Sequence, residues 1–179
     1  MIASIQHKNL VRLLGCCSDG PQRLLVYEYL KNRSLDLIVY GKVDHFLNWS
    51  TRFQIIIGIA RGLQYLHEDS HLQIVHRDIK ASNILLDEKF QPGLEILVWL
   101  DSFMKTKLIL APHLLELCKG YTAPEYAIRG ELSEEADIYS FGVLVLAILS
   151  CRKNTDLTLP SEMQYLLEYV GLHLFIILT

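Results

Sequence analysis

The most informative segment of the chain is Ile74-Val75-His76-Arg77-Asp78-Ile79-Lys80-Ala81-Ser82-Asn83-Ile84-Leu85-Leu86. It brings a carboxylate, an ammonium group and an amide close together in sequence, at Asp78, Lys80 and Asn83, between two apolar runs. A chance loop between apolar segments is the alternative interpretation. The length of the pattern and the Ile-Leu-Leu that follows it argue against that alternative and favour a functional loop.

The composition limits the classes of function. The chain has 179 residues, enough for one substantial core, and its 17 basic and 20 acidic residues give a sequence pI of about 6.1. This near-neutral balance gives no electrostatic reason to expect nucleic-acid binding. Four cysteines are present, with Cys16 and Cys17 adjacent in an apolar run. We interpret them as buried small residues in a reducing compartment rather than as a disulfide framework.

The chain ends carry no predicted targeting signal. The segment after Met1 has no charged region followed by an apolar run, so no signal peptide is expected. Residues 170–178 are apolar but fall far below the roughly 20 residues of a membrane-spanning helix. We therefore expect no transmembrane segment in this chain and interpret residues 169–179 as a divergent apolar tail.

Two strands are predicted near the beginning of the chain. Residues 9–17 and 23–29 are apolar runs, and the Ser-Asp-Gly-Pro between them, at 18–21, is a strong turn signal. The pattern predicts a hairpin, two strands of a small sheet.

Two long helices are predicted farther on. Apolar residues recur at helical spacing after the cap candidates Asn48 and Ser50 and predict a helix to about His67. Its buried face is expected to hold Phe53, Ile56, Ile57, Ala60, Leu63 and Leu66. Ser133 precedes acidic residues that favour a helix N-terminus, and the following apolar residues predict a helix through Leu149. This second helix is hydrophobic nearly all round, as a central core helix would be.

Several motifs together carry a resemblance to a known family. They are Gln6–Gly15, Leu25–Tyr29, Asn32–Asp36, the loop at 74–86, Gly120–Tyr126 and Asp137–Val143. Together they resemble the kinase domain of plant receptor-like serine/threonine kinases, with the cysteine-rich and S-domain types as the nearest branches. The resemblance covers roughly residues 1–90 and 119–168.

The resemblance implies an α+β, protein-kinase-like fold that is truncated in this chain. Residues 1–26 would be a two-strand remnant of the small lobe, and residues 27–31 would be the hinge. Residues 32–168 would form a mostly α-helical large lobe. Within that lobe, residues 88–118 would be a divergent activation-segment region.

The resemblance also assigns roles in the loop. Asp78 would receive the proton of an attacking Ser or Thr hydroxyl, Lys80 would balance charge on the transferring phosphoryl group, and Asn83 would hold a magnesium ion. ATP and Mg²⁺ are the implied cofactors, and a protein substrate or a partner kinase is the implied partner. His76 lies among apolar residues, so we interpret it as a structural, hydrogen-bonded histidine rather than a base or a zinc ligand.

The resemblance also implies site residues outside the loop at 74–86. Glu28, Tyr29 and Leu30 resemble the hinge that binds adenine through its backbone, with Tyr27 guarding the back pocket just before it.

Three further residues have implied structural or regulatory roles. Arg77 could pair with a phosphate on an activation loop, because guanidinium recognises phosphate in a bidentate way. Glu125 belongs to an Ala-Pro-Glu that resembles the end of the activation segment, where substrates dock. Asp137 resembles the core-helix carboxylate that braces the loop's backbone, with a plain helix-face carboxylate as the alternative.

The departures from the family pattern predict impaired catalysis. The glycine-rich loop, the phosphate-binding Lys and its Glu partner would lie before Met1. The metal-binding Asp-Phe-Gly is expected at 96–98, where the chain has Ile-Leu-Val, and Asp101 lies too late to replace it cleanly. Ala147 stands where the family has a Glu in the core helix. Phosphoryl transfer depends on such positioning groups.

Codon degeneracy suggests an origin for the divergent segment at 93–118. Read out of frame, synonymous codons for residues 95–107 permit Asp-Phe-Gly-Leu-Ala-Arg, and the same shift across 115–118 permits Gly-Thr-Leu. Our hypothesis is a pair of compensating frameshifts, real or introduced by a gene model. The apolar residues 94–100 and 108–111 would then lie where a solvent-facing loop belongs, so we expect exposed apolar area and poor solubility.

Three interpretations of function follow. The chain is an ATP-dependent protein serine/threonine kinase, a non-catalytic pseudokinase fragment that binds a partner, or the product of an incomplete gene model. The family implies a cytoplasmic location, or the cytoplasmic face of the plasma membrane if the chain is part of a longer receptor.

Overall fold

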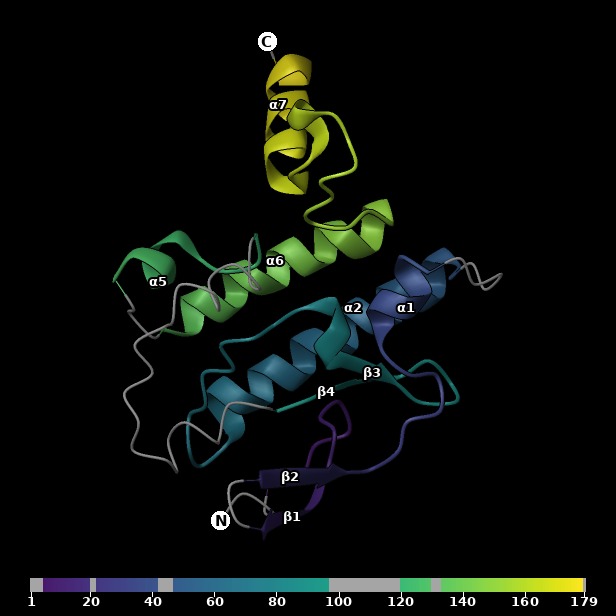
Figure 1. Cartoon of the computed structure of the whole chain (residues 1–179), viewed down its shortest axis with the longest axis vertical. Helices are drawn as coiled ribbons and strands as arrows, with labels where there is room; N and C mark the ends of the chain where they lie inside the picture. The colour runs from purple at the N-terminus through teal and green to yellow at the C-terminus, as the bar shows by residue number, and fades with distance from the viewer. Residues whose placement is uncertain (1–4, 20–21, 42–46, 97–119, 130–132, 179) are drawn as a thin grey trace.

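The computed structural model describes residues 5–19, 22–41, 47–96, 120–129 and 133–178. The described elements are, in order, β1 (Leu13–Asp19), β2 (Gln22–Tyr27), α1 (Leu35–Val39), α2 (Trp49–Gln64), the π-helix η2 (Tyr65–Asp69), the 3-10 turn η3 (Ala81–Asn83), β3 (Ile84–Leu86), β4 (Pro92–Leu94), α5 (Pro124–Arg129), α6 (Glu134–Ser150), the 3-10 turn η4 (Ser161–Met163) and α7 (Leu166–Leu178). Figure 1 shows the β1–β2 hairpin at one end, the α2, β3 and β4 layer next, α6 beyond it and α7 at the opposite end.

The predicted hairpin is confirmed. Strands β1 and β2 pair antiparallel, with Cys17 opposite Leu24 and an irregularity near the start of β1. The expected burial of Cys16 and Cys17 is wrong, because both are exposed. Leu24 and Val26 on the partner strand are also exposed, so this two-stranded sheet lacks a covering layer over these residues.

Helix α2 begins where the sequence predicts. The Asn48 side chain accepts a hydrogen bond of 2.8 Å from the Thr51 amide and so satisfies a free N–H at the helix start. The helix runs to Gln64 and continues as the π-helix η2, so the expected extent to about residue 67 is confirmed.

The buried face of α2 differs from the expected one. Phe53 is 47% exposed and the side chains at 56, 57 and 60 are only half-buried. The fully buried stripe contains Ile55, Gly58, Ile59, Gly62 and Leu63. The predicted burial of Leu63 and Leu66 is confirmed. Because the two glycines in the stripe carry no apolar side chain, the hydrophobic pattern did not identify the rest of this face.

The two glycines of this stripe allow close approach of other segments. A Cβ added to Gly58 would lie 2.4 Å from the Pro92 side chain, and one added to Gly62 would lie 2.9 Å from the Asn9 carbonyl oxygen. The Asn9 amide in turn donates 3.0 Å to the Pro92 carbonyl. The α2 backbone at these two glycines therefore lies directly against the Pro92 ring and the Asn9 segment.

Helix α6 is confirmed from its cap onward. Ser133 accepts a hydrogen bond from the Ala136 amide, and the helix runs from 134 to 150. The expected burial all round is wrong, because Ile138 is 58% and Leu149 is 41% exposed. Its buried residues recur every three or four positions, so α6 presents a single face to the core.

A buried arginine joins the two long helices. Arg52 of α2 donates through Nε to the Leu47 carbonyl at 2.9 Å and through Nη1 to the carbonyls of Ile148 and Leu149. The Ile148 and Leu149 carbonyls belong to the last turn of α6, where a helix offers its carbonyls no amide partners of its own. A cation at this end also complements the helix dipole. Arg52 therefore fixes the position of α2 against α6.

One apolar core connects these elements. Helices α1, α2 and α6, strands β3 and β4 and the residues between η2 and η3 contribute to it, and its fully buried members include Leu35, Ile55, Ile59, Leu66, Ile79, Ile84, Leu86, Leu94, Leu144 and Ile148. Leu94 was expected in a badly packed, solvent-facing run, and that expectation is wrong, because β4 pairs with β3 and buries this side chain completely. The other expectations for 97–118, including Asp101 and Cys118, fall outside the described residues.

Helix α7 contains the predicted apolar tail. It has 13 residues, and in the described part of the chain no helix is both long and apolar enough to span a membrane.

The glycine contacts give a matched test of the packing. Gly58→Ala should destabilise the chain by about 1–3 kcal/mol, because the added methyl overlaps the Pro92 ring. Gly142→Ala should stabilise it by about 0.5–1 kcal/mol, because no atom lies within 4 Å of the added methyl on exposed α6 surface. Urea unfolding midpoints measure both. Equal effects of the two substitutions would contradict the packing described here.

Candidate active site

The loop at 74–83 is anchored at both ends. The Ile74 amide donates 2.8 Å to the Leu66 carbonyl in η2, and the loop ends in η3, which leads directly into the buried strand β3. Ile79 in the middle of the loop is 1% exposed. The apolar residues therefore fix the backbone, and the polar residues between them project from a rigid base.

The three predicted catalytic residues lie together. Lys80 Nζ is 2.8 Å from Asp78 Oδ2, and Asn83 Nδ2 donates to the same oxygen at 2.8 Å. Asn83 Nδ2 also donates 2.8 Å to the Asp78 carbonyl. Asp78 and Lys80 are 28% and 31% exposed, so a solute can reach this cluster. One carboxylate oxygen is thereby held by two donors at the surface.

His76 lies underneath this cluster and is fully buried. Its Nε2 is 2.8 Å from the Glu95 carbonyl and its Nδ1 accepts the Asp78 amide at 3.2 Å. These partners require the neutral form with the proton on Nε2. Burial also lowers the pKa of His76, and the hydrogen bond to the Glu95 carbonyl and the nearby carboxylates only partly offset this. His76 therefore supports the backbone at Asp78 as a neutral side chain.

A carboxylate from α6 accepts hydrogen bonds from the backbone of the loop. Asp137 Oδ2 accepts the His76 amide at 2.5 Å and Oδ1 accepts the Arg77 amide at 2.7 Å. His67 Nε2 of η2 lies 2.9 Å from the same Oδ2. Asp137 is 1% exposed, so its charge depends on these donors.

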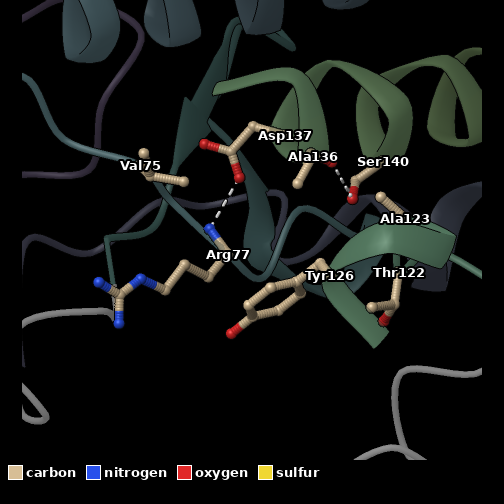
Figure 2. A pocket seen from close by; sticks show the side chains of 8 residues that line it. All are labelled: Val75, Arg77, Thr122, Ala123, Tyr126, Ala136, Asp137 and Ser140. Carbon is tan, nitrogen blue, oxygen red and sulfur yellow. Dashed lines mark hydrogen bonds between the residues drawn. The ribbon is translucent and has the colours of Figure 1, made fainter. Parts of the chain in front are cut away.

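Arg77 occupies a strained position above this carboxylate. Its φ of 72° lies in the left-handed region, which costs a residue other than glycine about 1–3 kcal/mol. The hydrogen bond that the Arg77 amide donates to Asp137 offsets part of that cost. Figure 2 shows the guanidinium pointing away from Tyr126 and α6, and its buried Nε has no hydrogen-bond partner among the residues that the structure describes.

A small cavity separates the loop from α5 and α6. Its volume is about 10 Å³, room for about one water molecule, and its lining consists of Val75, Arg77, Thr122, Ala123, Tyr126, Ala136, Asp137 and Ser140 (Figure 2). Loop, α5 and α6 therefore lie close together on this side of the site.

The motif before α5 is tied to two helices. Ser140 of α6 donates 2.6 Å to the Tyr121 carbonyl, and the Tyr121 hydroxyl lies 3.2 Å from that of Tyr40, next to α1. Gly120 has a φ of 92°, and a Cβ there would lie 1.8 Å from the side-chain Nδ2 of Asn154. Only glycine fits this position. Glu125 follows in α5 and is half-buried.

The predicted hinge lies between β2 and α1. The Glu28 amide donates 3.0 Å to the Arg12 carbonyl, and Glu28 Oε1 accepts the Arg12 amide at 2.7 Å, so this side chain turns back to β1. Tyr29 is 86% exposed and Leu30 is half-buried. The amide and the side chain of Glu28 are thus both bonded to Arg12.

Tyr27 connects the hinge with the segment after β4. Its hydroxyl donates 2.9 Å to the Ile96 carbonyl. Burial raises the pKa of Tyr27 to about 12, and the nearby Glu95 adds to the shift. Burial likewise raises the pKa of Glu95, as does the negative charge of Asp78, while Lys80 lowers it. Tyr27 therefore acts as a neutral hydrogen-bond donor.

The described residues do not form a magnesium site around Asn83. Mg²⁺ is commonly held by one or two carboxylates with phosphate oxygens and water. The Asp78 carboxylate already bonds Lys80 and Asn83, and Ile96 presents an apolar side chain that packs against the core. Within the described ranges, no group of three or more His, Cys, Asp or Glu could hold a metal ion. The donor set present does not fit this ion.

Sequence reasoning did not find two residues of the site. His67 was noted only as a helix end, and Glu95 only as part of a divergent segment. Neither had a local signal, because each acts through residues distant in sequence, Asp137 for His67 and His76 for Glu95.

Comparison with known proteins gives the family. The family model described as protein tyrosine and serine/threonine kinase matches residues 1–169. The chain is 49% identical over 168 residues to a probable LRR receptor-like serine/threonine-protein kinase of Arabidopsis thaliana, covering 94% of this chain and 16% of that protein. It is 50% identical over 159 residues to cysteine-rich receptor-like protein kinase 1 of the same plant, covering 88% of this chain and 26% of that protein.

A third relative extends the pattern. A G-type lectin S-receptor-like serine/threonine-protein kinase of Arabidopsis thaliana is 48% identical over 177 residues, covering 95% of this chain and 22% of that protein. The chain belongs to the protein kinase family, and its sheets and helices are part of a protein kinase fold. The predicted resemblance to plant receptor-like kinases is confirmed. The chain spans roughly a sixth to a quarter of the length of these three relatives.

The buried carboxylate of α6 gives a stability prediction. Asp137→Ala should destabilise the chain by about 3 kcal/mol or more, because it leaves the two loop amides and His67 without their acceptor in a buried site. Glu162→Ala, at an exposed position of η4, is the control and should change stability by less than about 0.5 kcal/mol. Chemical unfolding measures both, and a small loss for Asp137→Ala would contradict the brace.

Proposed function

We propose that this chain carries the hydroxyl-acceptor side of a protein serine/threonine kinase site, with phosphoryl transfer from ATP impaired on the metal-binding side. The supporting observation is the cluster at the loop surface, where one Asp78 oxygen bonds Lys80 and Asn83 while the other side of the loop is fixed by Asp137. The names of the relatives support the choice of Ser or Thr as the acceptor.

The chemistry of the cluster follows from its groups. Asp78 would accept the proton of a substrate hydroxyl as that oxygen attacks, and its rigid backbone would fix the carboxylate for this contact. Lys80 is already beside the carboxylate and would offset negative charge on the transferring phosphoryl group. Asn83 would keep Asp78 in one orientation through Nδ2 and retain its amide oxygen for a ligand.

The nucleotide side is proposed from the hinge. The backbone of Glu28, Tyr29 and Leu30 would contact adenine, and Tyr27 would limit the depth of the pocket through its bond to the Ile96 carbonyl. When bound, ATP and Mg²⁺ would supply the phosphoryl group and charge neutralisation. Because Ile96 offers no oxygen ligand from its side chain, we propose weak metal-dependent binding.

Two surface features would serve the protein substrate. The Arg77 guanidinium points away from Tyr126 and α6, and guanidinium recognises phosphate in a bidentate way, which would suit a phosphorylated activation segment. The segment Gly120–Glu125, tied to Tyr40 and Ser140, would form the docking platform for the substrate peptide. In this proposal residues 1–26 belong to the small lobe, residues 27–31 to the hinge and residues 32–168 to the large lobe.

A non-catalytic role is the second candidate. It is favoured by the apolar side chain at position 96, where the family pattern has the metal-binding carboxylate. In that case the chain would bind a partner kinase without magnesium-dependent nucleotide binding. A binding assay with magnesium present and absent distinguishes the two roles.

Transfer of labelled phosphate from ATP tests the proposal. With Mg²⁺ and a protein substrate, the wild-type chain should give no more product than Asp78→Asn. Ile96→Asp should raise product by about tenfold or more, because it supplies the carboxylate that the metal prefers.

The double variant Ile96→Asp with Asp78→Asn is the control and should lose that gain. Wild-type transfer above the Asp78→Asn level would contradict the impaired metal side. A gain from Ile96→Asp that survives in the double variant would contradict the role of Asp78. No gain at all would contradict the proposal that the missing carboxylate at position 96 impairs transfer.

A further inference from the structure

His67 is a buried histidine that contacts a carboxylate, and the proposed chemistry does not use it. It is 7% exposed, and its Nε2 contacts Asp137 Oδ2 at 2.9 Å, the same oxygen that accepts the His76 amide. Through Asp137, the His67 side chain is therefore two hydrogen bonds away from the backbone of the catalytic loop.

The local backbone presents His67 to that carboxylate. Helix α2 changes into the π-helix η2 at Tyr65, and the Ser70 amide closes the wider turn on the Tyr65 carbonyl at 2.7 Å. The Ser70 hydroxyl also donates 2.8 Å to the Leu66 carbonyl. A π-turn rotates side chains away from the direction that a regular helix would give them, and such turns are frequent at functional sites. Here the turn coincides with the histidine that reaches α6.

The charges that face His67 are mostly negative. Asp137 and Glu134 lie on α6, and Glu135 of the same helix also interacts electrostatically with His67. Glu68 lies next to His67 on η2. From the catalytic loop, the ring of His76 faces it, and the structure requires that ring to be neutral.

We propose that His67 is a positioning residue for the catalytic loop: its imidazolium holds the Asp137 carboxylate that braces the two loop amides. Losing the proton from His67 weakens that charge-assisted bond and leaves the buried carboxylate compensated only by amides. The loop is then held less tightly at Arg77, whose left-handed backbone is the part that relaxes most readily.

The pH dependence has a defined sign. The hydrogen bond that His67 donates to Asp137 raises the pKa of His67 above its ordinary 6.5, against the opposing effect of burial. The extra stability is therefore complete below the unfolded value and is lost as pH rises through the raised folded value. The bracing of the loop should therefore weaken as pH rises above the ordinary histidine value.

Hydrogen exchange of the full chain measures this directly. After correction for intrinsic exchange, protection of a peptide covering residues 75–79 should fall several-fold between about pH 5.5 and 8.5. In His67→Gln, which keeps an N–H donor without a titrating proton, the fall should disappear. In His71→Gln, which removes an exposed histidine from the same segment, the fall should remain as in the wild type.

The same preparation offers a second measurement if His67→Gln does not fold. The His67 ring signals in a wild-type NMR titration should report a pKa above the ordinary value. A pKa at or below that value, flat protection in the wild type, or a pH step that persists in His67→Gln would each overturn the proposal. The catalytic meaning of the brace rests on the proposed function, but neither readout needs nucleotide or transfer activity, so the two proposals fail separately.

Discussion

The carboxylate of Asp137 is the constraint on which the site depends. Helix α6 carries it into the core, where it is 1% exposed, and a buried charge persists there only with donors around it. The donors are the His76 and Arg77 amides and the ring of His67. Because two of them belong to the loop backbone, satisfying the charge fixes the loop. The strained Arg77 backbone is retained for the same reason.

Around this carboxylate, the acceptor side of the site is assembled from elements far apart in sequence. Strand β3 buries the far end of the loop, His76 holds the Asp78 amide, and Asn83 with Lys80 orients the Asp78 carboxylate. None of these contacts involves position 96. In the proposed function, the acceptor side can therefore form while the metal side lacks its carboxylate. This separation would allow one chain to combine a firmly held loop with weak magnesium binding.

Local signals predicted the elements well. The hairpin turn, the caps Asn48 and Ser133 and the position of the loop all follow from short-range chemistry, and the structure agrees with them. The buried face of α2 was predicted only in part: Leu63 and Leu66 are buried as expected, but the stripe through Gly58 and Gly62 was missed because glycine adds no apolar side chain to the pattern.

The remaining errors concern contacts that no local pattern encodes. Burial of Cys16 and Cys17 was inferred from an apolar run, but burial depends on a second layer that the described hairpin lacks at these residues. Leu94 was assigned to a divergent loop, yet β4 needs only backbone pairing with β3 and a side chain of suitable size to enter the core. His67 gave no sign of its partner, since Asp137 lies 70 residues away.

A crystal structure of the chain grown with a non-hydrolysable ATP analogue and Mg²⁺ tests the central claim most directly. The account predicts the Asp78, Lys80 and Asn83 cluster in the arrangement described, with Asp137 on the two loop amides and no ordered metal between Asn83 and position 96. Nucleotide and two ordered metal ions seated against Asp78 would contradict it.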